Sequence, residues 1–316
     1  MRDAFVEELL AFLKRDAQVM LLTADLGFGI FDEIAAQCPG QFFNVGVAEQ
    51  NMVGIATGLA LEGRKVFTYS IANFAFLRCM EQIRNDACYH DLNINIAASG
   101  GGFSYGALGM SHHATEDLSI LRSLPGITLV APGTVWEMRQ AVPALLAAPG
   151  VSYLRIDKSH AEDSAAGAVP YTLGKARRLR EGTDVTLIAT GGILREALLA
   201  AEALAKERIE CRVLSMHTVK PLDEHEVLAA ARETRGIVTV EENTVLGGLG
   251  SAVAETCLEA GTSPGFFRRI GMADTYATVV GSQTYLKQIY GMDAAAIADT
   301  VRGQITSPAS LRQIKK

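Results

Sequence analysis

The sequence predicts an α/β protein of two domains, each a mainly parallel sheet flanked by helices. Short runs rich in β-branched residues alternate with helical patterns in both halves of the chain, as in parallel sheets covered by helices. The 316 residues correspond to about two domains of roughly 150 residues. A segment rich in Ala, Gly, Ser and Asp interrupts the alternation near residues 160–170. We therefore predict a first domain at 1–162, a linker at 163–180 and a second domain at 181–316.

The first domain is predicted to begin with a helix. Asp3 lies in its first turn and Lys14 and Arg15 in its last, the charge order that suits the helix dipole. Phe5 and Leu9 share one apolar face. Five strands are predicted to follow, at Val19–Thr23, Val66–Ser70, Ile94–Ala98, Thr128–Ala131 and Ser152–Ile156.

The second domain repeats the alternation on a smaller scale. Strands are predicted at Val185–Ala189, Cys211–Ser215 and Ile237–Val240, with helical patterns at Arg195–Lys206 and Asp223–Arg232 between them. The segment Gly247–Gly250 follows a strand and precedes a helix, but it lacks the full spacing of a dinucleotide-binding fingerprint. A turn at a helix start is the favoured interpretation.

Composition excludes several classes of protein. The net charge is −6 and the pI is about 5.6, so the basic surface that nucleic-acid binding requires is not expected. No stretch approaches the roughly 20 apolar residues of a membrane span. The five cysteines are scattered and contain no CxxC pair, which favours the reducing cytoplasm over a disulfide framework or zinc site. We expect a soluble, two-domain, cytoplasmic globular protein.

One stretch almost free of charge surrounds a single carboxylate. Between Val45 and Leu61 the only charged residue is Glu49, at the predicted start of a helix containing Gly54 and Gly58. Burial there disfavours the charged form of a carboxylate and fits it for proton transfer near neutral pH. A solvent-facing glutamate in a first helical turn is the alternative. The two glycines suit close approach of another backbone, such as a subunit contact.

Two further charge-poor stretches carry aromatic, glycine and histidine residues. In the first, Phe74 and Phe76 precede Arg78; core packing or stacking on a flat ligand ring both fit. In the second, the glycine-rich segment Gly100–Gly102 leads toward His112 and His113. Glycine loops let backbone amides approach a ligand, and histidines are candidate proton shuttles, although one of two adjacent histidines is often structural. No Lys-Ser or Lys-Thr follows, which excludes a P-loop, and no third ligand at close spacing indicates a metal.

In order along the chain, these segments resemble the C-terminal half of transketolase. The resemblance covers nearly the whole sequence and rests on the ordered segments Thr23–Gly27, Asn44–Asn51, Phe74–Asn85, Ser111–Pro125, Leu154–Arg155, Thr218–Leu222 and Val240–Asn243. It implies a thiamine-diphosphate pyrimidine-binding domain followed by the transketolase C-terminal domain.

The resemblance implies thiamine diphosphate as the cofactor. Glu49 is then expected to hydrogen-bond N1′ of the aminopyrimidine and promote its imino tautomer, which takes the proton from the thiazolium C2. Phe74 or Phe76 is expected to stack on the pyrimidine, with Arg78 in the same pocket. Asp25 is expected near the thiazolium and the substrate.

The other implied residues act on the substrate. His112 is expected to assist proton transfer and contact the substrate, with His113 as its catalytic neighbour, and Arg155 is expected to bind a substrate phosphate. Two positions depart from the sugar-phosphate enzymes: Gly100 stands where the family usually has histidine, and Leu108 where it has aspartate. An unusual donor or acceptor is therefore expected.

The sequence lacks the Gly-Asp-Gly segment that holds Mg²⁺ and the diphosphate in this family. The resemblance therefore implies a split transketolase, inactive until a separate N-terminal-type subunit supplies the diphosphate domain and the Mg²⁺ ligands. Such enzymes transfer a two-carbon ketol unit from a keto sugar to an aldehyde, and an α2β2 heterotetramer is expected. The alternatives are the β-subunit of a 2-oxo acid dehydrogenase, or a non-catalytic regulatory subunit with the same fold.

Overall fold

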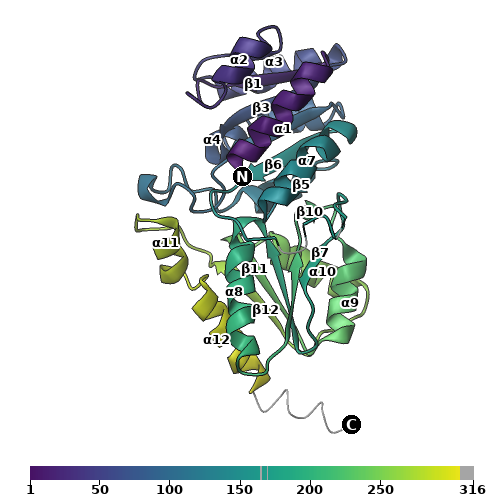
Figure 1. Ribbon diagram of the computed structural model, residues 1–316, viewed down its shortest axis with the longest axis vertical. Coiled ribbons are helices and arrows are strands. Elements are labelled where there is room, and N and C mark those ends of the chain that lie inside the picture. The colour runs from purple at the N-terminus through teal and green to yellow at the C-terminus, as the bar shows by residue number, and fades with distance from the viewer. Residues whose placement is uncertain (164–165, 169, 307–316) are drawn as a thin grey trace.

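All eight predicted strands are present in the computed structural model, which describes residues 1–163, 166–168 and 170–306. Within these residues, four further strands join them to form two sheets, one for each half of the chain. Both sheets are mainly parallel, and helices lie on their faces (Figure 1). The α/β class and the two-domain organisation are confirmed.

Seven strands form the first sheet of the described chain, and every one of its pairings except that of β10 is parallel. The strands are β1 (Val19–Thr23), β2 (Phe42–Asn44), β3 (Lys65–Ile71), β4 (Ile94–Ser99), β5 (Thr128–Val130), β6 (Ser152–Ile156) and β10 (Thr218–Lys220). Their order is β10-β5-β6-β4-β3-β1-β2. β10 comes from the second half of the sequence and pairs antiparallel with β5, so it fastens the second domain to the first sheet.

Helices cover both faces of this sheet. One face packs against α1 (Arg2–Arg15), α2 (Asp32–Gln37) and α7 (Val135–Ala147). The other face packs against α3 (Glu49–Leu61), α4 (Ala72–Phe76), a π-helical turn (Ile83–Cys88) and α6 (Asp117–Arg122). The short segments α5 (Met80–Gln82) and η2 (Gly106–Leu108) complete this domain. Because both faces are covered, the central strands are buried throughout.

The second sheet has the order β12-β11-β8-β9-β7 among the described residues, with β7 antiparallel at one edge. The strands are β7 (Arg177–Arg180), β8 (Val185–Thr190), β9 (Cys211–Ser215), β11 (Ile237–Thr244) and β12 (Phe267–Met272). The helices are η3 (Gly191–Ile193), α8 (Leu194–Ala205), α9 (Glu224–Glu233), α10 (Leu249–Glu259), α11 (Gln283–Ile289) and α12 (Ala294–Ile305). α8 and α12 cover one face, and α9 and α10 the other. No helix in the described ranges is long and apolar enough to cross a membrane.

The linker prediction needs one correction. Arg177–Arg180, placed in the linker at 163–180, forms β7 and pairs with β9. This run of charged residues carries little apolar signal because it lies at the sheet edge, where its side chains are mostly half-exposed. Residues 164, 165 and 169 of the linker, and 307–316 of the predicted second domain, lie outside the described residues.

Candidate functional site

Several of the predicted site residues lie near the carboxyl edge of the first sheet. Parallel strands present their carboxyl ends on one edge, where α/β proteins bind ligands. Asp25 follows β1, Phe74 follows β3, and His112 lies in the segment after β4. Glu49 begins α3 and is joined to this group by the contacts below.

Glu49 is buried and paired. Its side chain is 2% exposed and accepts a hydrogen bond from the Arg78 Nη1 at 2.8 Å. The Ser70 hydroxyl lies 3.4 Å from its other oxygen. The carboxylate is thus enclosed, as its charge-poor surroundings predict, but its partner is an arginine whose side chain is 48% exposed.

Of the two predicted aromatic residues, only Phe74 is available to a ligand. It is half-buried in α4, with the flat guanidinium of Arg78 centred 4.6 Å from its ring centroid. Phe76 is fully buried in the core and packs edge-on against Tyr153. A ligand role for Phe76 does not fit this position, because its ring is already surrounded by core side chains.

The two adjacent histidines have different surroundings. The His112 ring is partly exposed and lies 5.2 Å from Phe74, centroid to centroid. His113 is buried and its Nε2 faces the carbonyl of Gly106 at 3.1 Å. The Asn73 amide also donates to the carbonyls of residues 110 and 111, which holds the histidine segment against α4. His112 therefore faces the site, and His113 ties its loop together.

Asp25 contacts the segment that precedes α3. Its backbone is left-handed, with φ 55°, and its carboxylate accepts a hydrogen bond from the Asn44 side chain at 2.9 Å. Asn44 in turn accepts from the backbone N–H groups of Asp25 and Gly46 at 3.0 Å. These contacts join the end of β1 to the segment leading into Glu49.

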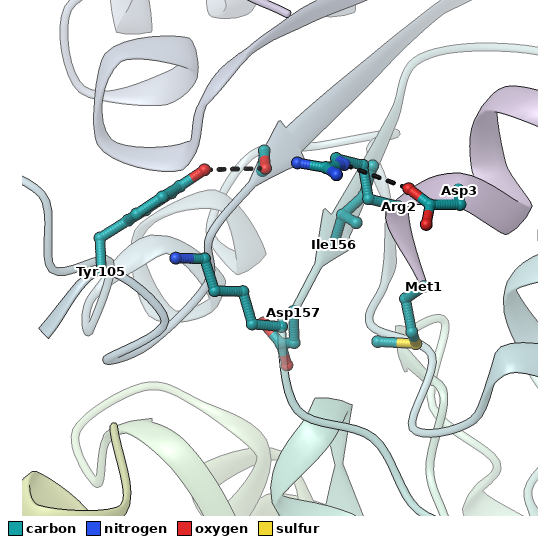
Figure 2. Close-up of a pocket in the computed structure, with 8 residues that line it drawn as sticks. Met1, Arg2, Asp3, Tyr105, Ile156 and Asp157 are labelled. Atoms are coloured by element: carbon teal, nitrogen blue, oxygen red, sulfur yellow. Dashed lines mark hydrogen bonds and ion pairs between the residues drawn. The ribbon is translucent and has the colours of Figure 1, made fainter. Parts of the chain in front are cut away.

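A pocket of about 300 Å³ opens at the ends of β4 and β6 (Figure 2). The ring of Tyr105, which lines it, lies 6.3 Å from that of His112, centroid to centroid. Cationic and acidic side chains share its rim. Its lining consists of Met1, Arg2, Asp3, Ser99, Tyr105, Ile156, Asp157 and Lys158.

Sequence reasoning predicted none of these eight lining residues as site residues, Tyr105 and Lys158 included. A Cβ atom at Gly100 would overlap the Tyr105 ring, so this ring fills the space that a side chain at 100 would need. The Lys158 ammonium lies 4.1 Å from the centroid of the same ring, and His112 lies 6.3 Å from it. A cation two residues beyond a central strand is the signal that predicts Lys158.

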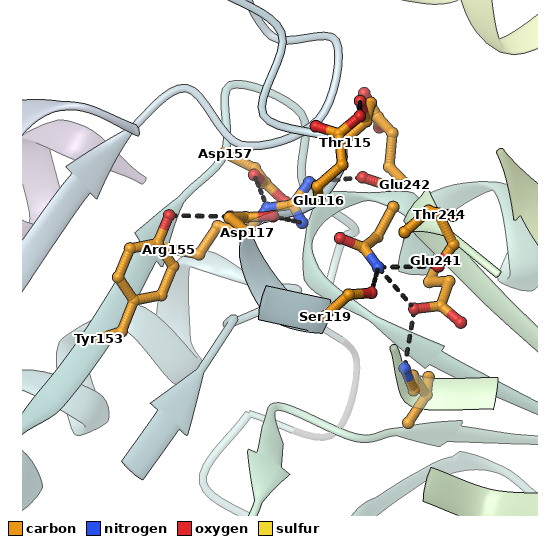
Figure 3. A network of polar contacts seen from close by, with 12 residues as sticks. Thr115, Glu116, Asp117, Ser119, Tyr153, Arg155, Asp157, Glu241, Glu242 and Thr244 are labelled. Atoms are coloured by element: carbon orange, nitrogen blue, oxygen red, sulfur yellow. Dashed lines mark hydrogen bonds and ion pairs between the residues drawn. The ribbon is translucent and has the colours of Figure 1, made fainter. Parts of the chain in front are cut away.

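Arg155, the predicted phosphate ligand, is instead buried at the junction of the domains (Figure 3). Its guanidinium donates to Asp117 at 3.2 Å, to Asp157 at 3.0 Å and to the carbonyl of Glu242 at 2.8 Å. Burial opposes its charge, but the two carboxylates hold the pKa of Arg155 above its ordinary value. A substrate role does not fit, because the side chain is 2% exposed and its three donor nitrogens already have partners.

Two neighbouring glutamates of β11 accept hydrogen bonds from backbone N–H groups in or next to the two glycine-rich segments. Glu242 accepts a hydrogen bond from the backbone N–H of Phe103 at 2.5 Å. Glu241 accepts from the N–H groups of Leu249 and Gly250, both at 2.8 Å, at the start of α10. Burial raises the pKa of each glutamate to about 7. Gly247–Gly250 is therefore the predicted helix-start turn, and its amides are occupied by Glu241.

In the described part of the chain, no three His, Cys, Asp or Glu side chains are arranged to hold a metal ion. All five cysteines are free, and four of them are buried. Gly54 and Gly58, predicted to meet another backbone, are exposed, and a Cβ at either position would meet no atom of this chain.

Two family models match the chain. The transketolase pyrimidine-binding domain matches residues 1–163, and the transketolase C-terminal domain matches residues 174–297. The chain belongs to the transketolase family. In this transketolase-family chain, the first model spans the whole candidate site and the second spans Glu241 and Glu242.

Two of the relatives of this transketolase-family chain are named as transketolase subunits. It is 41% identical over 298 residues to the 6-deoxy-6-sulfo-D-fructose transketolase subunit SqwH of Clostridium sp. strain MSTE9, covering 94% of this chain and 92% of that one. It is 36% identical to an apulose-4-phosphate transketolase subunit of Phocaeicola vulgatus, covering 95% of each. A solved structure described as "Split gene transketolase, inactive beta4 tetramer" superposes with a TM-score of 0.87 at 34% identity, covering 96% of this chain and 98% of that one.

Proposed function

We propose that this chain is the pyrimidine-binding subunit of a split, thiamine-diphosphate-dependent transketolase. Its site transfers a two-carbon ketol unit from a keto sugar to an aldehyde and is completed by a partner subunit. One observation supports this most strongly. A buried carboxylate, Glu49, an available ring, Phe74, and a partly exposed His112 meet at one sheet edge.

These residues fit the aminopyrimidine of thiamine diphosphate. The guanidinium of Arg78 is itself a flat group with N–H donors, and it lies over Phe74 while donating to Glu49. Glu49 and Phe74 thus already bind a planar nitrogen group by its edge and its face, the two contacts that an aminopyrimidine needs.

The chain's own residues have separate tasks in this mechanism. The bound cofactor supplies the carbanion chemistry that cleaves and forms the carbon–carbon bond. Glu49 holds a proton at the pyrimidine N1′, and its burial excludes water from that contact. Phe74 orients the ring, and Asp25 fixes the turn that leads into Glu49. His112 moves protons on the substrate from the open side of the site.

The partner is a separate N-terminal-type subunit with the diphosphate-binding domain and the Mg²⁺ ligands. The proposed assembly is an α2β2 heterotetramer in the cytoplasm. Gly54 and Gly58 are exposed and available to a subunit contact. The structural relative, which is described as an inactive tetramer of β-chains, supports the need for a second subunit.

The donor is proposed to be a ketose with an anionic tail that differs from the common pentose phosphates. The names of the two relatives contain a sulfo group and a phosphate, both anions. Lys158 and Tyr105, which line the pocket of Figure 2, offer a cation and a phenol, and the Tyr105 ring lies 6.3 Å from that of His112. Leu108, where the family usually has aspartate, is 56% exposed and apolar, which also supports a donor other than the common pentose phosphates.

Reconstitution tests the proposal. The full chain is assayed alone, with thiamine diphosphate and Mg²⁺, and then with a partner chain containing the Gly-Asp-Gly domain. Ketol transfer from an anionic ketose only in the mixture is expected. Full activity of the chain alone overturns the split architecture, and acyl transfer to a lipoyl domain makes the chain a 2-oxo acid dehydrogenase subunit. A mixed complex that assembles without any turnover makes it a regulatory subunit.

A further inference from the structure

The segment from Gly100 to Tyr105 ends at a residue that lines the pocket of Figure 2, and the second domain contacts this segment directly. Its glycines lie where other side chains come close: a Cβ at Gly101 would overlap Arg155, and a Cβ at Gly102 would lie 2.6 Å from atoms of Glu242. Gly102 also has a left-handed backbone, with φ 56°. The glycines thus admit groups of the protein itself.

One hydrogen bond crosses the domain boundary to this loop. The buried Glu242 carboxylate accepts from the Phe103 N–H at 2.5 Å. The Gln283 amide, at the start of α11, donates to both Glu242 oxygens at 3.0 and 3.1 Å and so orients the carboxylate. Charge-assisted bonds of this kind are about twice as strong as neutral ones.

The loop has other ties besides this bond. Near Tyr105, the Ser104 hydroxyl accepts from the Lys158 N–H at 3.2 Å, and the Tyr105 hydroxyl lies 3.3 Å from that of Ser99. Gly100 and Gly102 are held by backbone bonds to residues 156 and 114, and the N–H of Ser104 donates to the carbonyl of Gly101. The Tyr105 ring itself rests over Gly100 and beneath the Lys158 ammonium. The bond at the Phe103 N–H is the tie that the second domain contributes two residues before Tyr105, which lines the pocket.

We propose that Glu242 is a positioning residue through which the second domain holds the Gly100–Tyr105 loop, and with it the substrate-facing side of the site. Glu242 touches no substrate in this scheme. It acts on Tyr105 through Phe103, and its effect falls on the substrate side rather than on the pyrimidine contacts of Glu49 and Phe74. The kinetic consequences rest on the proposed function, whereas the anchoring of the loop does not.

The neighbouring Glu241 provides a matched control. It is equally buried, and the pKa of each is raised to about 7, but it caps α10 within its own domain. Hydrogen exchange is measured on the full chain alone. In Glu242→Ala the peptide covering Gly100–Tyr105 is expected to exchange about tenfold faster, as loss of one such bond predicts, while Glu241→Ala speeds exchange at the start of α10 instead.

Conservative variants keep the test decisive. Glu242→Gln retains an acceptor oxygen and is expected to restore protection of the loop. Glu242→Asp withdraws the carboxylate by one methylene and replaces the alanine variant if that fails to fold. Unchanged exchange of the loop in a folded Glu242→Ala or Glu242→Asp protein overturns the proposal, as does an equal effect of Glu241→Ala.

The assembled enzyme separates positioning from general damage. In Glu242→Ala the KM for the ketose donor is expected to rise several-fold while the Kd for thiamine diphosphate stays unchanged. If the KM for the donor and the Kd for thiamine diphosphate rise by the same factor, the role of Glu242 is not confined to the substrate side. If no ketol transfer is found for the wild-type complex, the proposed function fails, and the exchange experiment still decides the role of Glu242.

Discussion

The two sheets of this chain are both mainly parallel, but their carboxyl edges differ: one is open to a pocket, and the other is buried against the first domain. The edge of the first sheet ends in a pocket of about 300 Å³ and in side chains such as Phe74 and Lys158 that are partly or largely exposed. The edge of the second sheet meets the first domain, and its carboxylates, Glu241 and Glu242, are bonded to backbone amides of the chain itself. The same strand-end geometry that builds a binding site in one domain builds a domain junction in the other.

The comparison teaches that a glycine-rich segment after a strand is not sufficient evidence of a ligand site. Gly100–Gly102 and Gly247–Gly250 both have backbone groups open to close approach, and in both a glutamate of β11 makes that approach. The first-domain edge differs because its charged residue, Glu49, is paired with a half-exposed arginine that a ligand can displace.

Substitution of Glu49 tests the functional edge most strongly. Glu49→Gln retains the size of the side chain but removes its charge, and the turnover of the assembled enzyme is expected to fall by about 10²- to 10⁴-fold, the usual contribution of a positioned acid or base. Steady-state kinetics with saturating cofactor measure it. Glu62→Gln, at the exposed end of the same helix, is the control. Equal turnover of the two variants would show that the first edge is not catalytic.

Substitution of Arg155 tests the junction. Arg155→Met leaves Asp117 and Asp157 buried without their cation, so the free energy of unfolding is expected to fall by about 3–5 kcal/mol. Chemical denaturation measures the change. Arg302→Met, on the surface, is expected to change stability little. A variant of wild-type stability with a raised donor KM would instead restore the phosphate role that the sequence predicts.

Much of the fold is predictable from the sequence because buried strands carry a strong apolar signal. β1, β6 and β9 begin and end at the predicted residues. β7 and β12 escape prediction because they are edge strands, with arginines mostly at exposed or half-exposed positions. β10 escapes prediction as a strand of the first sheet because its pairing joins residues far apart in the chain.

The candidate site is only partly predictable from the sequence. Charge-poor surroundings mark Glu49, and the ordered motifs mark His112 and Phe74. The resemblance assigns Arg155 to the substrate, and the sequence does not show that this strand-end cation is buried at the domain junction while Lys158 is exposed at the pocket. The sequence also does not show which aromatic residue of a short helix faces the core, and this leaves Phe76 beside Phe74.

The pH dependence of stability tests whether Glu242, at the buried edge of the second sheet, is protonated in the folded chain. Burial, and then the nearby Asp157 carboxylate, raises the pKa of Glu242 from its ordinary 4.5 to about 7. A raised pKa means that the folded state binds a proton more tightly than the unfolded state. The stability that this group contributes is therefore present below about pH 4.5 and is lost as pH rises to about 7.

The measurement compares wild type with Glu242→Gln, which does not titrate. Across that pH interval the wild type is expected to lose roughly 3 kcal/mol relative to the variant, since each pKa unit corresponds to about 1.4 kcal/mol. Denaturation at a series of pH values gives this difference, and other titrating groups cancel in it. If the difference in free energy of unfolding between the two proteins does not change with pH, Glu242 is charged in the folded state, like the carboxylates of an ordinary ion pair.

The smallest expected effect concerns the exposed cation of the open edge. Lys158→Ala is expected to raise the KM for an anionic ketose about tenfold, because a hydrogen bond to a charged group is worth about 1.5–3 kcal/mol and exposure to salt weakens it. The wild-type KM should rise with ionic strength and that of the variant should not. Lys206→Ala, exposed at the end of α8, provides the matched loss of charge elsewhere. If both variants shift KM equally, the attraction comes from the general field of the protein; if neither does, the donor's anionic end lies away from the pocket of Tyr105 and Lys158.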